Sequence, residues 1–118
     1  MLVFVYGTLK RGGWNNFRMP GEFVREAETI PRYRIFTDGT LPYLTENYRY
    51  GLAVRGEVWL VDEDGLAYLD RLEGVDRNFY RRDEIFLADG STAMAYFACH
   101  KVDNMTDCGR EYKPPDWD

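Results

Sequence analysis

The stretch Leu52–Gly74, LAVRGEVWLVDEDGLAYLDRLEG, places the clearest strand of the chain next to its clearest helix. Its first ten residues alternate between two faces, which is the period of a half-buried strand. One face carries Val54, Gly56, Val58 and Leu60. Asp62 is a suitable N-cap, and the leucine spacing after it predicts a helix over 63–73 that Gly74 ends. The stretch therefore predicts strand and helix packed in one domain.

Further strand-like runs precede this stretch. Residues 2–5 form an unbroken apolar run, which is typical of a strand buried on both faces. The segments 23–30 and 33–37 are predicted as two separate strands because Pro31 lies between them. The proline inside 41–44 predicts a sheet edge or a bend for that run.

The residues after the helix indicate a hairpin. Segments 79–87 and 92–99 are strand-like and are joined by Asp89-Gly90, which is a strong hairpin signal. The last dozen residues are predicted to be irregular, and a helical turn is expected around Asn16 in the loop near the N-terminus. The sum is five to seven strands and one or two helices, an α+β domain built on a curled sheet or barrel.

Composition limits the kind of protein. The 118 residues fit a single domain, 1–118, and the net charge of −5 argues against nucleic-acid and membrane partners. No apolar run is long enough to cross a membrane, and the N-terminus lacks the pattern of a signal peptide. Cys99 and Cys108 allow one disulfide, but we expect a reduced, cytoplasmic setting.

Glu73 is a carboxylate in an unexpected place. It lies four residues after Leu69 and seven after Leu66, so helical spacing puts it on or beside the buried stripe. Burial and the negative end of the helix dipole both raise the pKa of a carboxyl, which suits a general base near neutral pH. The alternative is that the last turn frays and Glu73 lies in water or pairs with Arg71 or Arg77.

The turn Tyr6-Gly7-Thr8-Leu9 ends the first strand and is the second candidate element. Successive backbone N–H groups at a strand end can bind a carboxylate or an oxyanion. Gly7 removes a Cβ that would block a ligand, and Thr8 adds a hydroxyl donor. The alternative is a plain strand-to-loop turn.

With these elements in hand, the chain resembles the γ-glutamylcyclotransferase superfamily, the AIG2-like group, and within it most closely the γ-glutamylamine cyclotransferase branch. Residues 3–12 match its Tyr-Gly-[Ser/Thr]-Leu signature and continuation. Residues 56–59 match its G-E-[VL]-[YW] strand, and residues 69–74 match its D-x-[LF]-E-G helix end. Residues 79–82 fit the tyrosine-arginine pair that follows, and residues 41–44 are a weaker match to a proline-containing segment.

The resemblance implies a compact mixed β-barrel with two helices and a small-molecule γ-glutamyl substrate. Members release 5-oxoproline and a free amine or amino acid from γ-glutamyl amides. By similarity, Glu73 is the acid/base, and Tyr6, Gly7, Thr8 and Leu9 hold the glutamyl moiety. Tyr112 is a further candidate, as an aromatic wall of the pocket or as an exposed tail residue. No cofactor is implied, and the oligomeric state stays open.

Other functions remain possible on these residues. A non-catalytic module could use the same loop to bind a small carboxylate, and a third candidate is cyclotransfer on a specialised γ-glutamyl biosynthetic intermediate. Cys99, His100 and Cys108 match no zinc pattern, so we predict no metal site. The Cys99-His100 neighbours are also a poor nucleophilic pair, because adjacent strand residues point to opposite faces. Lys10 and Arg11 could steer an anionic substrate or could only be solvated.

Overall fold

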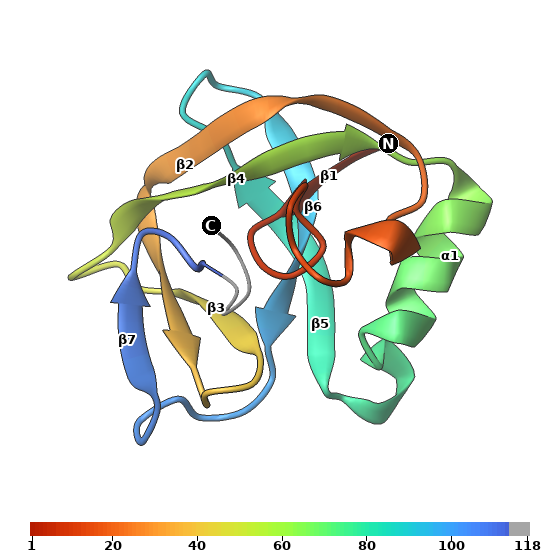
Figure 1. Ribbon diagram of the computed structural model, residues 1–118. Coiled ribbons are helices and arrows are strands. Elements are labelled where there is room, and N and C mark those ends of the chain that lie inside the picture. Colours follow the sequence, from red (N-terminus) through yellow and green to blue (C-terminus); the bar gives the residue numbers. More distant parts are fainter. Residues whose placement is uncertain (114–118) are drawn as a thin grey trace.

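The computed structural model describes residues 1–113 and shows seven strands wrapped around one core, with one α-helix at the side (Figure 1). The strands are β1 (Leu2–Val5), β2 (Glu22–Thr37), β3 (Pro42–Glu46), β4 (Leu52–Leu60), β5 (Tyr80–Phe86), β6 (Thr92–Ala98) and β7 (Thr106–Gly109). The helix is α1 (Glu63–Leu72), and two short 3₁₀ helices are η1 (Asn16–Arg18) and η2 (Val75–Arg77).

Five of the strands close into a barrel. The hydrogen-bonded order runs β1-β4-β2-β3-β6, and β6 pairs back to β1 in parallel at Val3 and Met94. β3 and β6 are also parallel, whereas the other pairs are antiparallel. β5 extends β6 through the hairpin and β7 extends β2. The expected mixed barrel of five to seven strands, the hairpin and the helical turn near Asn16 are thus confirmed.

β2 corrects one prediction. The structure shows a single strand of 16 residues where two strands separated by Pro31 were expected. The pairing with β4 shifts register on both sides of Pro31, so the proline sits at an irregularity where no ladder N–H is needed. Beside it the Thr29 hydroxyl accepts from Val54 N at 2.9 Å. The strand therefore bends at the proline without ending there.

Two further expectations were also wrong in detail. β3 pairs with β2 on one side and with β6 on the other, so of the two alternatives for this run, a sheet edge or a bend, the edge is wrong; Pro42 is tolerated because it occupies the first position of the strand. The C-terminal region is not irregular throughout, since residues Thr106–Gly109 add β7 to the side of β2. Residues 110–113 lie in no helix or strand, and the remainder of the expected tail, residues 114–118, lies outside the described residues.

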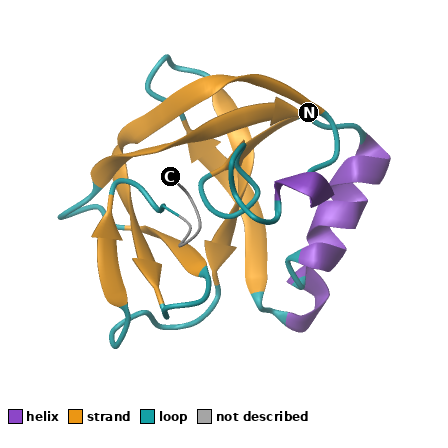
Figure 2. Cartoon of the chain, in the orientation of Figure 1, coloured by secondary structure: helices purple, strands orange, loops and turns teal. Residues whose placement is uncertain are grey.

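α1 lies outside the barrel, with its C-terminal end next to η2 and the start of β5 (Figure 2). The Asp62 carboxylate accepts from Gly65 N at 2.8 Å, which confirms the N-cap, and Gly74 adopts φ 66° where the helix closes. Leu66 and Leu69 are buried against the barrel. Within residues 1–113 no helix has the length and apolar character needed to span a membrane.

The core has two halves on either side of the β1–β4 layer. Val54 and Val58 of β4 point into the barrel, as the alternation predicted. Trp59 belongs to the second half, under α1, and Glu57 is also buried, so this face of β4 is covered as well. Leu60, expected on the inner face, is instead 49% exposed. β4 is therefore buried on both faces at its centre and leaves the core at its end.

Candidate active site

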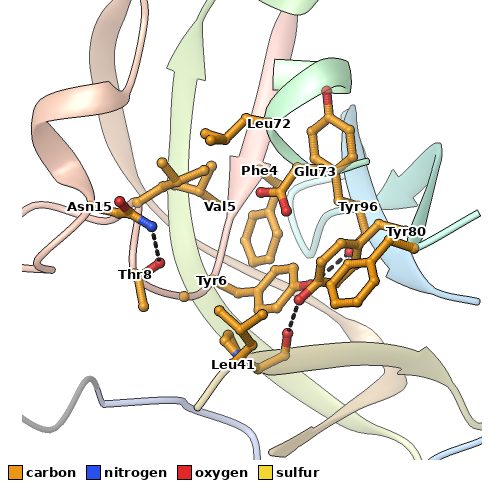
Figure 3. A pocket seen from close by; sticks show the side chains of 14 residues that line it. Phe4, Val5, Tyr6, Thr8, Asn15, Leu41, Leu72, Glu73, Tyr80 and Tyr96 are labelled. Carbon is orange, nitrogen blue, oxygen red and sulfur yellow. Dashed lines mark hydrogen bonds between the residues drawn. The ribbon is translucent and has the colours of Figure 1, made fainter. Parts of the chain in front are cut away.

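A cavity of about 120 Å³ opens beside the end of β1 (Figure 3). Its walls come from the turn after β1, the residues before and at the start of β3, the last turn of α1, and β5 and β6. Apart from Glu73, the described residues that line it are apolar, aromatic or uncharged polar side chains. The cavity therefore brings together the two elements that the sequence singled out, Glu73 and the Tyr6–Leu9 turn.

Glu73 caps the C-terminus of α1, with its backbone N–H bonded to Leu69 O at 2.8 Å. Its half-buried carboxylate points into the space beside Phe4 and Tyr96 (Figure 3). Among residues 1–113 no hydrogen bond or ion pair engages this carboxylate, so the alternative of a pair with Arg71 or Arg77 is wrong. Burial raises its pKa from 4.5 to about 7. An unpaired carboxyl with this pKa can exchange a proton near neutral pH.

The turn after β1 is fastened to β4 by Glu57. This buried carboxylate accepts from the Arg11 backbone N–H at 2.9 Å and contacts Arg11 Nε at 3.0 Å. It also accepts from Trp59 Nε1 at 3.2 Å. Glu57 thus fixes the chain just after the turn. In the matched G-E-V-W run, residues 56–59, the glutamate binds the loop and the tryptophan donates a hydrogen bond that holds the glutamate in place.

Two asparagines of the same loop close the turn on itself. Asn15 donates to the Thr8 hydroxyl at 3.3 Å and its backbone N–H to Thr8 O at 3.1 Å. Asn16 donates to Leu9 O at 2.9 Å. These bonds use two carbonyl groups and one hydroxyl oxygen of the turn. Within the described residues, no hydrogen bond uses the backbone N–H groups of Gly7, Thr8 or Leu9. The turn can therefore offer N–H donors to an anion.

Gly7 is needed for packing against Pro42, in addition to the expected role of leaving room for a ligand. A Cβ built at this position would lie 2.6 Å from Pro42 Cγ, closer than real Cβ atoms approach a neighbour. The space beside Gly7 is thus filled by the rigid ring of the first β3 residue. The glycine is needed for close packing of the turn against β3, and this packing forms one corner of the cavity.

Three tyrosines surround the carboxylate. Tyr6 donates to Tyr96 O at 2.7 Å, and Tyr80 donates to Pro42 O at 2.8 Å. Tyr96 donates to the Asp70 carboxylate at 2.7 Å. Burial raises the pKa of each hydroxyl, and the nearby Glu73 charge raises it further. All three therefore stay neutral, and their protons are directed to acceptors other than Glu73.

Tyr112 lies apart from this group. Tyr112 is buried in the half of the core that lies inside the barrel, so the alternative of an exposed tail residue is wrong. It is also absent from the described residues that line the cavity. Its carbonyl accepts from Lys10 Nζ at 2.9 Å. Lys10 is only 3% exposed, and burial lowers its pKa. The expectation of a solvated or steering Lys10 is therefore wrong, because its side chain binds the C-terminal segment.

The cysteine and histidine cluster takes no part in the cavity. Cys99 and Cys108 are free thiols, and no group of three or more metal-ligating side chains occurs within residues 1–113. His100 packs edge-on against Phe79 at 5.1 Å and Tyr43 at 5.9 Å. Phe79 lines the cavity, so the ring of His100 supports its wall from behind.

Sequence reasoning missed four residues that shape the site: Tyr80, Tyr96, Pro42 and Asn15. Tyr96 lies on β6, and nothing local distinguishes it from other strand aromatics. For Tyr80 a signal existed in the matched tyrosine-arginine pair, and for Pro42 in the weaker match of the segment before the central strand. Asn15 had no signal beyond its position in a glycine-rich loop.

Comparison with known proteins agrees with this geometry. The family model described as γ-glutamyl cyclotransferase, AIG2-like, matches residues 3–118, and the chain belongs to this family. A Vibrio cholerae relative named "Putative gamma-glutamylcyclotransferase" is 39% identical over 110 residues, 92% of each chain. The human γ-glutamylaminecyclotransferase is 35% identical over 88 residues, which are 68% of this chain and 58% of the human one.

A solved structure gives the same fold. The crystal structure of an AIG2-like protein from Mus musculus superposes with a TM-score of 0.81 and 25% sequence identity. The match covers 95% of this chain and 87% of the mouse chain. The barrel, with its attached helix, is thus the fold of this family.

Proposed function

We propose that this protein is a γ-glutamyl cyclotransferase that releases 5-oxoproline and a free amine or amino acid from a γ-glutamyl amide. The names of the relatives support the reaction class, and the cavity supports the assignment of roles. In this reaction the α-nitrogen of the glutamyl moiety forms a bond to the γ-carbonyl carbon of the same molecule. The amide C–N bond then breaks and the amine leaves.

Glu73 carries the proton in this proposal. An α-ammonium has no free electron pair, so it must lose a proton before it can attack. The unpaired Glu73 carboxylate faces the cavity and, with a pKa of about 7, accepts that proton near neutral pH. The same carboxyl then gives the proton to the departing nitrogen. After the attack the ring nitrogen still carries one proton more than the lactam. The ionised Glu73 carboxylate takes this second proton and passes it to the released amine, which leaves as an ammonium ion, so the protons balance without a second base.

The turn after β1 binds the charges of the glutamyl moiety. Its N–H groups at Gly7, Thr8 and Leu9 are free of protein acceptors among residues 1–113 and border the same cavity as Glu73. They suit an oxygen that becomes negative when the carbonyl carbon turns tetrahedral. Because the attacking and attacked atoms belong to one substrate, the site needs to hold a bent conformation more than to supply a strong nucleophile.

One observation carries the proposal: a carboxylate with a pKa of about 7 shares a small cavity with backbone N–H donors, and neither has a hydrogen-bond partner among residues 1–113. A residue that only stabilised the fold would be paired or exposed. Tyr112 stays in the proposal as a secondary element. Its buried position and the Lys10 bond to its carbonyl support the start of the loop, and this role replaces direct contact with the substrate.

The test is a panel of γ-glutamyl compounds incubated with wild type and Glu73→Gln. The panel holds the isopeptide with the lysine side chain, simple γ-glutamyl amines and γ-glutamyl amino acids. We expect wild type to release 5-oxoproline from at least one of them and Glu73→Gln to lose at least about 100-fold in kcat/KM. Glu63→Gln, on the exposed start of α1, is the matched control and keeps full activity.

The panel also separates the alternative of a binding module. Near-full activity of a folded Glu73→Gln variant would contradict the role of Glu73. If wild type released no 5-oxoproline but its thermal unfolding temperature rose with a γ-glutamyl compound, the protein would be a binding module on the same fold. The circular dichroism spectrum of Glu73→Gln, matched to wild type, shows that the variant is folded.

A further inference from the structure

Tyr96 makes two hydrogen bonds that lead to the two halves of the site. Its hydroxyl donates to the Asp70 carboxylate at 2.7 Å, and its backbone carbonyl accepts from the Tyr6 hydroxyl at 2.7 Å. Figure 3 draws the bond between the Tyr6 hydroxyl and the Tyr96 carbonyl beside the cavity. One residue of β6 is therefore bonded to α1 through its side chain and to the end of β1 through its backbone.

The first bond reaches the turn that carries the base. Asp70 lies three residues before Glu73, in the last turn of α1. The same Asp70 oxygen lies 3.2 Å from Arg82 Nε on β5, so the helix end is tied to two neighbouring strands. Both charges of that pair are about a quarter exposed, with side-chain exposures of 29% and 27%. In this setting the neutral Tyr96 hydroxyl supplies a short directional bond that salt does not screen.

The second bond reaches the turn that carries the backbone donors. Tyr6 directly precedes Gly7, and its ring is buried in the interior half of the core. The Tyr6 hydroxyl is held by the Tyr96 carbonyl, which is itself fixed in the β5–β6 ladder opposite Arg82. The position of the turn thus depends on the same segment of β6 that holds the helix end.

Glu73 is held through its backbone N–H, which is bonded to Leu69 O. Its carboxylate has no partner among residues 1–113, and helix ends normally fray. A displacement of about 1 Å between a base and its reaction partner costs about 100-fold in rate. We propose that Tyr96 is a positioning residue, which fixes the separation between Glu73 and the Tyr6–Leu9 turn through its bonds to Asp70 and Tyr6. This inference rests on the proposed function.

The test compares Tyr96→Phe, Asp70→Ala and the double variant. Tyr96→Phe keeps the ring and the backbone carbonyl and removes only the bond to Asp70. We expect kcat to fall about tenfold, KM to change less than about twofold and the unfolding temperature to change little. Asp70→Ala removes the acceptor of the Tyr96 hydroxyl together with the contact to Arg82, so adding Tyr96→Phe to it should cause no further loss of kcat. Tyr48→Phe, an exposed tyrosine that donates to the Glu46 carboxylate at 2.6 Å, is the control and keeps kcat.

A second readout is independent of turnover. The carboxyl carbon of Glu73 is followed through a pH titration by NMR and is identified by its absence in Glu73→Gln. Wild type should titrate near the pKa of about 7 that burial gives this group. In Tyr96→Phe the looser helix end admits water, so the pKa of Glu73 falls toward its usual range, and adding Tyr96→Phe to Asp70→Ala causes no further fall.

The outcomes separate the two proposals. Unchanged kcat together with an unchanged titration of Glu73 in Tyr96→Phe would overturn the positioning role. Additive losses of kcat in the double variant would overturn it as well. If wild type acted on none of the γ-glutamyl compounds, the proposed function would fail. The titration would still decide the positioning role, which holds if Glu73 shifts and falls if it does not.

Discussion

At pH 7 about half of the Glu73 carboxyl groups are ionised, because burial raises the pKa of this residue to about 7. Only the ionised form can accept a proton from the substrate, and only the protonated form can return it. A group balanced in this way performs both transfers without a large free-energy cost in either direction. The value follows from the position of a single residue, one place beyond the last helical leucine.

The pH dependence of activity follows from that value. We expect kcat/KM to rise about tenfold per unit of pH below 7 and to level off above 7, because the base must be ionised before it can act. The measurement is 5-oxoproline release from pH 5 to pH 9. A profile that is flat from pH 5 to pH 8 would show that the base has its ordinary pKa or is a different group.

Gly7 offers a second prediction for a single residue. In Gly7→Ala the new Cβ would lie 2.6 Å from Pro42 Cγ, so the turn or the start of β3 must move. We expect a loss of about 1–3 kcal/mol in the free energy of unfolding and a rise in KM of at least tenfold. Denaturation in urea and steady-state kinetics give the two values.

The double variant Gly7→Ala/Pro42→Ala checks the cause. Removal of the proline ring makes room for the new methyl group, so the double variant should recover part of the stability and affinity that Gly7→Ala loses. If Pro42→Ala only adds its own loss, the clash with the ring is not what Gly7 avoids.

Among the elements, α1 and the turn after β1 are held by different means. α1 begins at a side-chain cap and ends at a left-handed glycine, and both signals are local in the sequence. The turn is instead held by Glu57, which lies 46 residues after Arg11. This contrast explains why the helix could be predicted from its own residues, whereas the anchor of the turn could not.

The cap of α1 provides a prediction about stability alone. Asp62→Ala removes the acceptor for Gly65 N, which is 2.8 Å away, and should cost about 1 kcal/mol in the free energy of unfolding. We expect kcat at 25 °C to stay unchanged, because the cap lies at the end of α1 opposite to Glu73. Asp64→Ala is the control: it removes an acidic side chain of the first turn that does not cap, and it should cost clearly less.

At the scale of the molecule, the buried Glu73 carboxylate lowers the free energy of unfolding. The pKa of Glu73 is about 7 in the folded protein against an ordinary value of 4.5. The folded state therefore binds more protons between these values, and its stability falls as pH rises from 4.5 to 7. Below pH 4.5 the carboxyl is neutral in both states and this loss is absent.

Glu73→Gln should remove this pH-dependent loss. We expect the variant to gain stability relative to wild type as pH rises from 4.5 to 8, by up to about 3 kcal/mol, because the amide is neutral throughout. Urea denaturation of both proteins at pH 4.5 and pH 8 measures the difference. A difference that is the same at the two pH values would mean that Glu73 has an ordinary pKa in the folded protein.

The sequence analysis reached the parts of this molecule that depend on near neighbours. Glu73 stood out because helical spacing placed a charge on an apolar stripe, and Asp89-Gly90 identified the hairpin. The continuity of β2 through Pro31 could not be predicted, because it depends on which strand N–H groups face a partner. The two hydrogen bonds of Tyr96 could not be predicted either, because their partners lie 26 and 90 residues away in the sequence.

The closure of the barrel has a consequence for how the protein is made. β1 pairs with β4 through Leu2 and Leu60, and with β6 through Val3 and Met94. We therefore expect the first strand to stay unpaired during synthesis until β4 and β6 have been made, with its apolar residues exposed. Pairing over such distances makes folding slow. Glu57 of β4 can anchor the turn after β1 earlier, but the bond from Tyr6 to the Tyr96 carbonyl forms only once β6 is in place, so we expect the cavity to be completed last.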